Sequence, residues 1–160
     1  MKIAVITDIH DNLINLSRAV NSINFNEEIE IVILCGDIGH SSEVIDYLSK
    51  LTKRQYVALS SIDIKNNDLF GYFNNSAIDC FSPFGKIEVD GRKIGFTHEE
   101  KYAKEQKGFD VIFYGHWHRY ETKIVNGTLF VCCGELEERK IRPCYVVYDT
   151  DTNEVEKVDV

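Results

Sequence analysis

The sequence begins with MKIAVITDIH over residues 1–10, and these ten residues are the clearest indication of the fold. Residues 2–7 form a short apolar run rich in β-branched side chains, which predicts a buried strand. Asp8 and His10 follow the strand directly. Residues 12–23 then carry apolar side chains at helical spacing, and the asparagine that opens this helix is its predicted N-cap. The stretch therefore predicts a strand, a turn with two ligand-type side chains, and a helix.

The same pattern is repeated in the next part of the chain. Buried strands are predicted at residues 29–35 and 55–59, and a helix between them begins at Ser41 or Ser42 and ends near residue 51. The order strand, helix, strand, helix, strand predicts a parallel sheet with right-handed crossovers.

The second part of the chain changes to short strands joined by tight turns. Asp90-Gly91 and Asn126-Gly127 are hairpin signals, and a third hairpin is predicted around residues 150–153. The predicted elements here are helices at 69–73 and 99–106 and strands at 78–81, 85–89, 93–97, 110–114, 119–125, 128–132, 144–148 and 155–158. We therefore predict a single domain over residues 1–160. Its expected fold is α/β, a four-layer-like α/β/β/α sandwich of two mixed β-sheets flanked by helices.

The composition fits a folded domain and restricts its partners. The chain has 160 residues, of which 44% are hydrophobic and 28% charged, and its net charge is −8. This charge and the lack of a basic run disfavour non-specific nucleic-acid binding. A small phosphate ester bound by metal ions remains compatible, because the ions supply positive charge locally.

The cysteines and the apolar segments indicate a cytoplasmic protein. The five cysteines are odd in number and form no C-x-x-C pair, so we expect buried thiols in a reducing compartment. The first residues are too few for a signal peptide, and no apolar stretch reaches the ~20 residues of a membrane span. A homo-oligomer remains open, since no interface can be located from the sequence.

Strong ligand types follow the ends of the predicted strands. In open α/β sheets, ligands bind outside the carboxyl ends of the strands, so separate strands should deliver these side chains to one edge. They are Asp8 and His10, Asp37, residues 60–63, His98, and His116 with His118.

These residue types predict a metal site. Imidazole and carboxylate groups together bind Mn, Fe, Zn, Ni or Co. A carboxylate such as Asp37 can bridge two cations, and two metals about 3.5–4 Å apart form a hydrolytic site. We therefore expect two divalent ions, of Mn, Ni, Fe or Zn.

Four motifs in this order resemble those of calcineurin-like metallophosphoesterases, in particular the small single-domain phosphodiesterases of bacteria and archaea. The D-x-H, G-D, H and G-H-x-H motifs of that family are similar to Asp8-Ile9-His10, Gly36-Asp37, His98 and Gly115-His116-Trp117-His118. The resemblance covers nearly the whole chain and implies the metallo-dependent phosphatase fold.

The resemblance also implies a role for each residue. Asp8, His10, Asp37 and His118 would hold the first ion, and Asp37 would bridge. His98 and His116 would hold the second ion, together with an asparagine. The implied reaction is attack on phosphorus by a metal-bound hydroxide, without a covalent enzyme intermediate.

This chain departs from the family pattern after the third strand. Ser61 stands where the family has its asparagine, and a serine hydroxyl is a poorer ligand than an amide oxygen. The second ion would then bind weakly or take Asp63, Asn66 or Asn67 instead. The expected metal ligands are Asp8, His10, Asp37, His98, His116, His118 and Ser61, and the expected catalytic residues are Asp37, His98 and Asp63. Glycines of the family pattern are also lost near residues 11 and 60. The family's final N-P-G-S motif corresponds to residues 132–135, CCGE, and only its glycine is shared.

Three hypotheses follow. The first is a metal-dependent phosphodiesterase or phosphatase acting on a small phosphoester. The second is a binding scaffold with a degraded metal site, since a retromer coat subunit resembles this fold. The third is an enzyme that holds a single ion and turns over slowly.

Other polar and aromatic residues have simpler interpretations. His40 fits a solvated loop histidine, and residues 137–140 (EERK) fit a solvated charged loop. Trp117 and Tyr120 could line a substrate pocket, but packing is the commoner role of an aromatic side chain.

Overall fold

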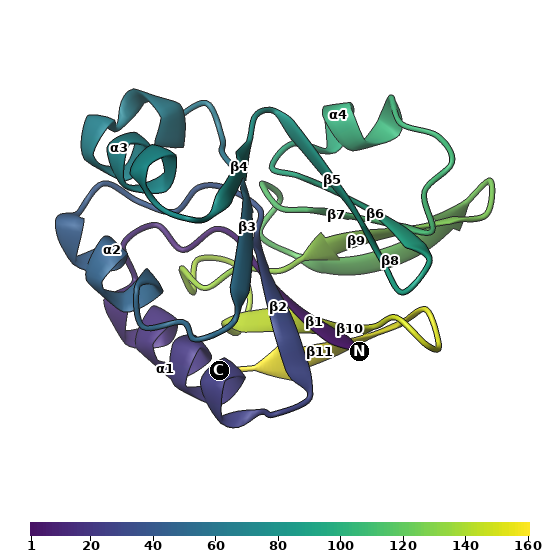
Figure 1. The fold of residues 1–160 in the computed structure, drawn as a ribbon, viewed down its shortest axis with the longest axis horizontal. Coiled ribbons are helices and arrows are strands. Elements are labelled where there is room, and N and C mark those ends of the chain that lie inside the picture. Colours follow the sequence, from purple (N-terminus) through teal and green to yellow (C-terminus); the bar gives the residue numbers. More distant parts are fainter.

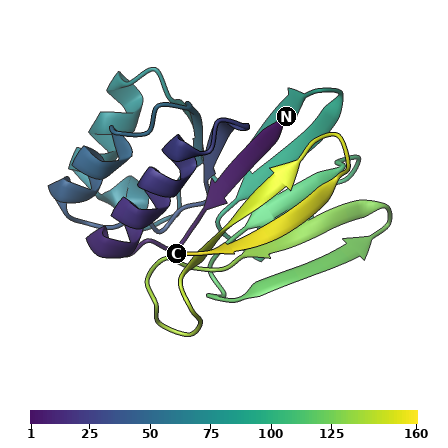
Figure 2. The same ribbon diagram turned by 90° about the horizontal axis from the view of Figure 1, so that it is seen from below.

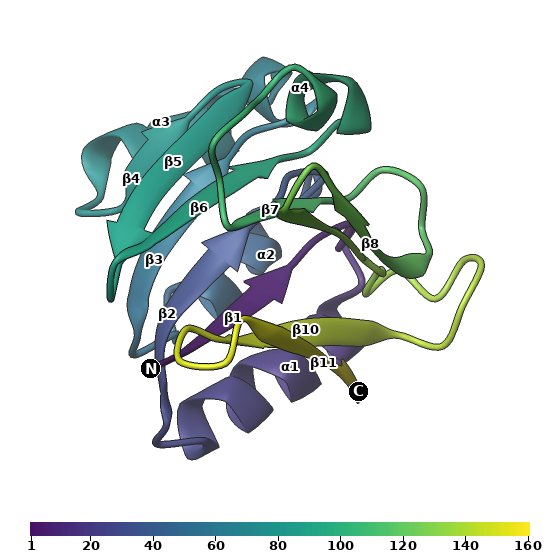
Figure 3. The same ribbon diagram turned by 90° about the vertical axis from the view of Figure 1, so that its right-hand side faces the viewer.

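The computed structural model describes residues 1–160 and contains two β-sheets with helices on their outer faces (Figure 1). In the six-stranded sheet the order is β11-β10-β1-β2-β3-β4. Its strands are β1 (Lys2–Ile6), β2 (Ile29–Leu34), β3 (Arg54–Ala58), β4 (Asp79–Phe81), β10 (Cys144–Asp149) and β11 (Glu154–Asp159). Strands β1 to β4 are parallel to one another, as Figure 3 shows for β1, β2 and β3, whereas β10 is antiparallel to β1.

The five-stranded sheet has the order β5-β6-β7-β9-β8 and is also mixed. Its central strands β6, β7 and β9 are parallel, and the outer strands β5 and β8 join them as antiparallel hairpins. The strands are β5 (Phe84–Val89), β6 (Arg92–Thr97), β7 (Val111–Tyr114), β8 (Tyr120–Val125) and β9 (Thr128–Cys133). The predicted sandwich of two mixed sheets flanked by helices is therefore confirmed.

The alternation of side chains along β1 explains the layers. Ile3 and Val5 point into a core between the two sheets, whereas Ala4 and Ile6 point into a second core beneath the helices. Because both faces of β1 are buried, its sequence is continuously apolar. Figure 2 shows the helices gathered on one side of the six-stranded sheet and the other sheet on its opposite side. The helices there are α1 (Leu13–Phe25), α2 (Ser42–Leu48) and α3 (Asn67–Asn75), and α4 (Glu100–Lys104) lies against the five-stranded sheet.

The helix boundaries differ from the predicted ones where local hydrogen bonds decide them. Helix α2 ends at Leu48 because Lys50 and Leu51 donate to carbonyls only three residues earlier and tighten the chain into a turn. Helix α3 is longer than predicted because Asn66 caps its first turn with its side-chain oxygen. It is preceded by a short 3₁₀ helix, η1 (Asp63–Lys65). Helix α4 is shorter than predicted at both ends.

Two further expectations can be compared with the structure. Asn12 caps α1 as predicted, and its side chain accepts from the backbone nitrogen of Asn15. All five cysteines are free thiols and four of them are buried, with Cys80 half-buried. None of the helices has both the length and the apolar character that crossing a membrane requires.

Candidate metal centre

The candidate ligands come from loops at the carboxyl ends of strands in both sheets. Asp8 and His10 follow β1, and Asp37 follows β2, in the six-stranded sheet. In the five-stranded sheet, His98 follows β6, and His116 and His118 follow β7. The two sheets therefore meet at this edge, and all six predicted histidine and aspartate ligands come together there.

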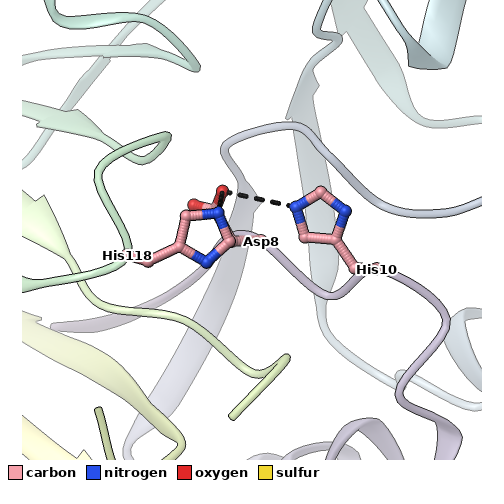
Figure 4. A group of neighbouring side chains, drawn as sticks. All are labelled: Asp8, His10 and His118. Carbon is pink, nitrogen blue, oxygen red and sulfur yellow. Dashed lines mark ion pairs between the residues drawn. The ribbon is translucent and has the colours of Figure 1, made fainter. Parts of the chain in front are cut away.

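Asp8, His10 and His118 form the first group (Figure 4). The Nε2 atom of His118 lies 3.3 Å from Asp8 Oδ1, and His10 Nε2 lies 3.7 Å from the same oxygen. The two imidazole rings stack with their centroids 5.3 Å apart. The other Asp8 oxygen accepts from the Thr7 hydroxyl and from the backbone nitrogen of His116. Asp8 is thus held by one oxygen and presents the other to the two imidazoles.

Asp37, His98 and His116 form the second group. The Asp37 Oδ2 atom lies 3.2 Å from His98 Nε2, and His116 Nδ1 lies 3.3 Å from the same His98 nitrogen. The other ring nitrogen of His98 donates to the Cys35 carbonyl at 2.8 Å. Since a carbonyl can only accept, this bond leaves Nε2 of the neutral ring with its lone pair facing Asp37.

Asp37 connects the two groups. Its Oδ2 atom lies 3.2 Å from His98 in the second group and 3.4 Å from His10 Nε2 in the first. A carboxylate in this position can be shared by two cations.

Unpartnered polar atoms at the centre of the cluster test whether cations fit it. Asp8 Oδ1, His10 Nε2 and Asp37 Oδ1 are buried and have no hydrogen-bond partner, and neither does Glu137 Oε2 beside them. Leaving such atoms without a partner is unfavourable. All four can act as metal ligands, so the donor set fits divalent cations.

The carboxylates also change the protonation of the histidines. Burial alone would lower the pKa of His98, but the hydrogen bond to Asp37 and the charges of Asp8 and Asp37 outweigh it and raise this pKa to about 9. Burial opposes ionisation of Asp37, yet His98 holds the pKa of Asp37 at about 2. The Asp8 carboxylate raises the pKa of His10. In the absence of an ion, His10 and His98 therefore retain their protons to higher pH, because the carboxylates give the site excess negative charge.

The backbone around the ligands is unusual. Five of the six ligand residues have a positive φ: Asp8, His10, Asp37, His116 and His118, with values between 44° and 72°. Non-glycine residues rarely adopt this conformation, and it concentrates at functional sites.

Two glycines allow the loops to approach one another closely. Gly36 has φ +76°, and a Cβ there would lie 2.8 Å from the His98 Cβ. A Cβ on Gly115 would lie 1.9 Å from Thr7 Oγ1 and 2.4 Å from Asp8 Oδ2. The glycines of both motifs are therefore required by the packing of the ligands.

The structure does not bring Asp63 into either group. Its buried carboxylate accepts hydrogen bonds from the backbone nitrogens of Asp37, Ile38 and Ser60, each at 2.9 Å. Burial outweighs these bonds and raises the pKa of Asp63. Both oxygens are turned toward the backbone, so Asp63 does not lie where the predicted catalytic residue or replacement ligand would be. It instead fixes the loop that carries Asp37.

The other replacement ligands are not brought in either. Ser61 is exposed and lines a hollow of about 200 Å³ beside His98, but it belongs to neither group. The Asn66 side chain is engaged at the start of α3 and with the Gly39 carbonyl. Asn67 is exposed. The second group consequently has three candidate ligands.

The remaining predictions for polar and aromatic residues have mixed outcomes. His40 is exposed, as expected for a loop histidine. Tyr120 packs against the core between the sheets, in agreement with a packing role. Trp117 does not pack inside: it is 44% exposed, and its indole nitrogen lies 3.3 Å from a Glu100 oxygen.

The sequence interpretation missed two carboxylates. Glu135 Oε2 lies 2.5 Å from His118 Nδ1, and Glu137 Oε2 lies 3.4 Å from the same nitrogen and 3.8 Å from His10 Nε2. Both follow β9, a parallel neighbour of β7. The rule of strand ends could have found them, because acidic residues after β9 must lie beside the histidines after β7.

The chain is similar to proteins of a known family along nearly its whole length. The family model of the calcineurin-like phosphoesterase superfamily domain matches residues 1–153. A phosphodiesterase of Methanocaldococcus jannaschii is 26% identical, over 99% of this chain and 98% of that protein. The structure of an archaeal phosphodiesterase, also 26% identical, superposes with a TM-score of 0.87 over the full length of both chains.

A more distant structure shares only the fold. Vps29 of Entamoeba histolytica in complex with zinc has a TM-score of 0.63 and 19% identity, over 99% of both chains.

Proposed function

Since the chain belongs to the calcineurin-like phosphoesterase superfamily, and is thus a phosphoric ester hydrolase, we propose that it hydrolyses a small phosphodiester with two divalent metal ions. The observation that carries the proposal is the pair of ligand groups that share Asp37. Over 99% of this chain, 26% of the residues are identical to those of a phosphodiesterase. This similarity supports a phosphodiester as the substrate class.

The two ions would be held by different sets of side chains. The first would be bound by Asp8, His10, Asp37 and His118. The second would be bound by Asp37, His98 and His116. Manganese, nickel, iron and zinc all suit this mixture of imidazole and carboxylate ligands.

Each part of the site has a distinct task in the hydrolysis. When bound, the ions would make a water molecule acidic enough to be a nucleophile at neutral pH and would neutralise the phosphoryl oxygens. The protein's own residues set the geometry. Thr7 and the backbone nitrogen of His116 orient the Asp8 carboxylate, and the Cys35 carbonyl orients the His98 ring. The hollow beside His98 gives one substituent of the phosphodiester a place to bind.

Metal removal tests the proposal. We expect hydrolysis of bis-p-nitrophenyl phosphate by the purified protein in Mn²⁺ or Ni²⁺, and at least a ~100-fold lower rate in excess chelator, since metal ions contribute several kcal/mol to such reactions. Re-addition of the ion should restore the rate. Absence of turnover with every divalent ion, together with no bound metal by elemental analysis, would exclude the proposal.

Replacement of Ser61 with asparagine should strengthen the second ion site. Ser61 borders the hollow beside His98, so an amide oxygen at this position could complete the three ligands of the second group. We expect the affinity for the second ion to rise by ~10-fold, the lower end of the effect of groups that support a metal site. Hydrolysis at limiting metal should rise with it. Isothermal titration calorimetry with Mn²⁺ measures the affinity for each of the two ions.

Ser61→Ala is the matched control for this replacement. It removes the hydroxyl without adding an amide, and we expect it to bind both ions as the natural chain does. Unchanged metal content and activity in Ser61→Asn would show that the missing amide does not limit the second site.

The loss of the asparagine also supports two competing functions. A scaffold with a degraded site would bind no metal, and an enzyme with a single ion would contain about one ion per chain after saturation. Elemental analysis of the saturated protein separates them, since the proposed function requires two.

A further inference from the structure

A buried carboxylate lies directly behind His118. Glu135 has no exposed surface, and its Oε2 atom lies 2.5 Å from the Nδ1 atom of His118. Its other oxygen accepts from the backbone nitrogens of Lys140 and Ile141. The carboxylate is therefore fixed on one side by the backbone and faces the imidazole on the other.

This contact determines how the imidazole is used. A carboxylate can only accept, so Nδ1 of His118 carries the hydrogen and donates a hydrogen bond to Glu135. The Nε2 lone pair then points toward Asp8 Oδ1, 3.3 Å away. Carboxylates behind metal-binding histidines fix the tautomer and the ring orientation in this way, and they make the ring a stronger donor to the ion.

The loop that carries Glu135 is also clamped to the loop that carries Asp8. The backbone nitrogens of Leu136 and Glu137 both donate to the Asp8 carbonyl. The buried Asn15 side chain donates to the Leu136 carbonyl from α1. Glu135, His118 and Asp8 are thus held in one network that spans both sheets.

The second group has no equivalent support. The ring nitrogen of His98 that faces away from Asp37 is bonded to a neutral carbonyl, that of Cys35. His116 is exposed, and its Nδ1 atom faces His98. A carboxylate partner is therefore present behind a histidine of the first group only.

From this asymmetry we propose that Glu135 is a positioning residue that orients His118 and makes the first ion position the tighter of the two. The inference rests on the proposed function for the identity of the ligand, a divalent ion. It predicts that the ions bind in order, the first between Asp8, His10 and His118.

The test is replacement of Glu135 with glutamine in the full chain, which keeps the size of the side chain but removes its charge. We expect the affinity for the first Mn²⁺ to fall 10- to 100-fold, as for other second-layer partners of metal ligands, and the affinity for the second to change little. Mn²⁺ titration followed by electron paramagnetic resonance counts the free ion directly. Thermal unfolding of the metal-free variants checks that each one is folded.

A matched variant separates the orientation of His118 from a general loss of charge in this loop. Glu138→Gln removes an exposed charge from the same loop, and we expect wild-type affinity. Equal losses in Glu135→Gln and Glu138→Gln, or no loss in Glu135→Gln, would overturn the inference.

A second measurement does not need metal or a folded variant. Nitrogen-15 chemical shifts of the ring in the metal-free natural chain should show His118 protonated at Nδ1. A neutral ring protonated only at Nε2 would overturn the inference even if both ions bind. Conversely, a chain that binds no ion but shows the Nδ1 proton would refute the proposed function and leave the contact with Glu135 in place.

Discussion

Replacing Asp37 with asparagine should lower phosphodiester hydrolysis by about 1,000-fold, which corresponds to ~4 kcal/mol of transition-state stabilisation. The reason is the position of the side chain, because its Oδ2 atom lies within 3.4 Å of His10 Nε2 and 3.2 Å of His98 Nε2. Asparagine keeps the shape but removes the negative charge shared by the two ligand groups. Initial rates at saturating Mn²⁺, with the metal content of the same samples, measure the effect.

The fold of this variant should remain intact. The backbone nitrogen of residue 37 still donates to Asp63, and the new side chain has almost the same volume. Asp46→Asn is the matched control, since Asp46 is exposed on α2 and we expect full activity. If Asp37→Asn retained two bound ions and the wild-type rate, the proposal that the two ions share Asp37 would be wrong.

Replacing Asp63 with alanine should have the largest effect on stability. The change leaves the buried backbone nitrogens of Asp37, Ile38 and Ser60 without an acceptor. An orphaned buried donor costs about 1–3 kcal/mol, so we expect the free energy of unfolding to fall by ~3–5 kcal/mol, with some compensation by water. Urea denaturation of the metal-free protein measures this change.

The same variant should also bind metal more weakly, because two of the three orphaned nitrogens belong to the loop that positions Asp37. Asp68→Ala provides the control. Asp68 is an exposed residue in the first turn of α3, where an acidic side chain contributes only about 0.3–1 kcal/mol. A loss of unfolding free energy in Asp63→Ala no larger than in this control would show that the three hydrogen bonds are not important for stability.

Much of the site could be predicted from the sequence because its ligands follow strands that are themselves easy to recognise. Asp8, Asp37 and His98 stand immediately after apolar runs, and parallel strands bring their carboxyl ends to one edge. A different pattern predicts the two sheets: strands alternate with helices early in the chain, and hairpins follow them. The left-handed backbone at the ligands was not predictable, because it depends on the packing of several loops against one another.

The acidic residues were harder to interpret. Asp63 and Glu135 both look like polar loop residues near the site, and residue type alone does not show which atoms a carboxylate will meet. Asp63 turns toward three backbone nitrogens and away from the cluster, whereas Glu135 turns toward an imidazole. The distinction depends on the direction of a side chain within a folded loop.

The division of the ligands between the two sheets has a consequence for unfolding. Asp8, His10 and Asp37 belong to the six-stranded sheet, and the remaining histidines belong to the five-stranded sheet. Ions bound here would act as cross-links between the two halves of the sandwich, and neither half could open without releasing them. Bound metal should then slow hydrogen exchange throughout both sheets, because ligands that bind only the native state stabilise whatever must unfold to release them.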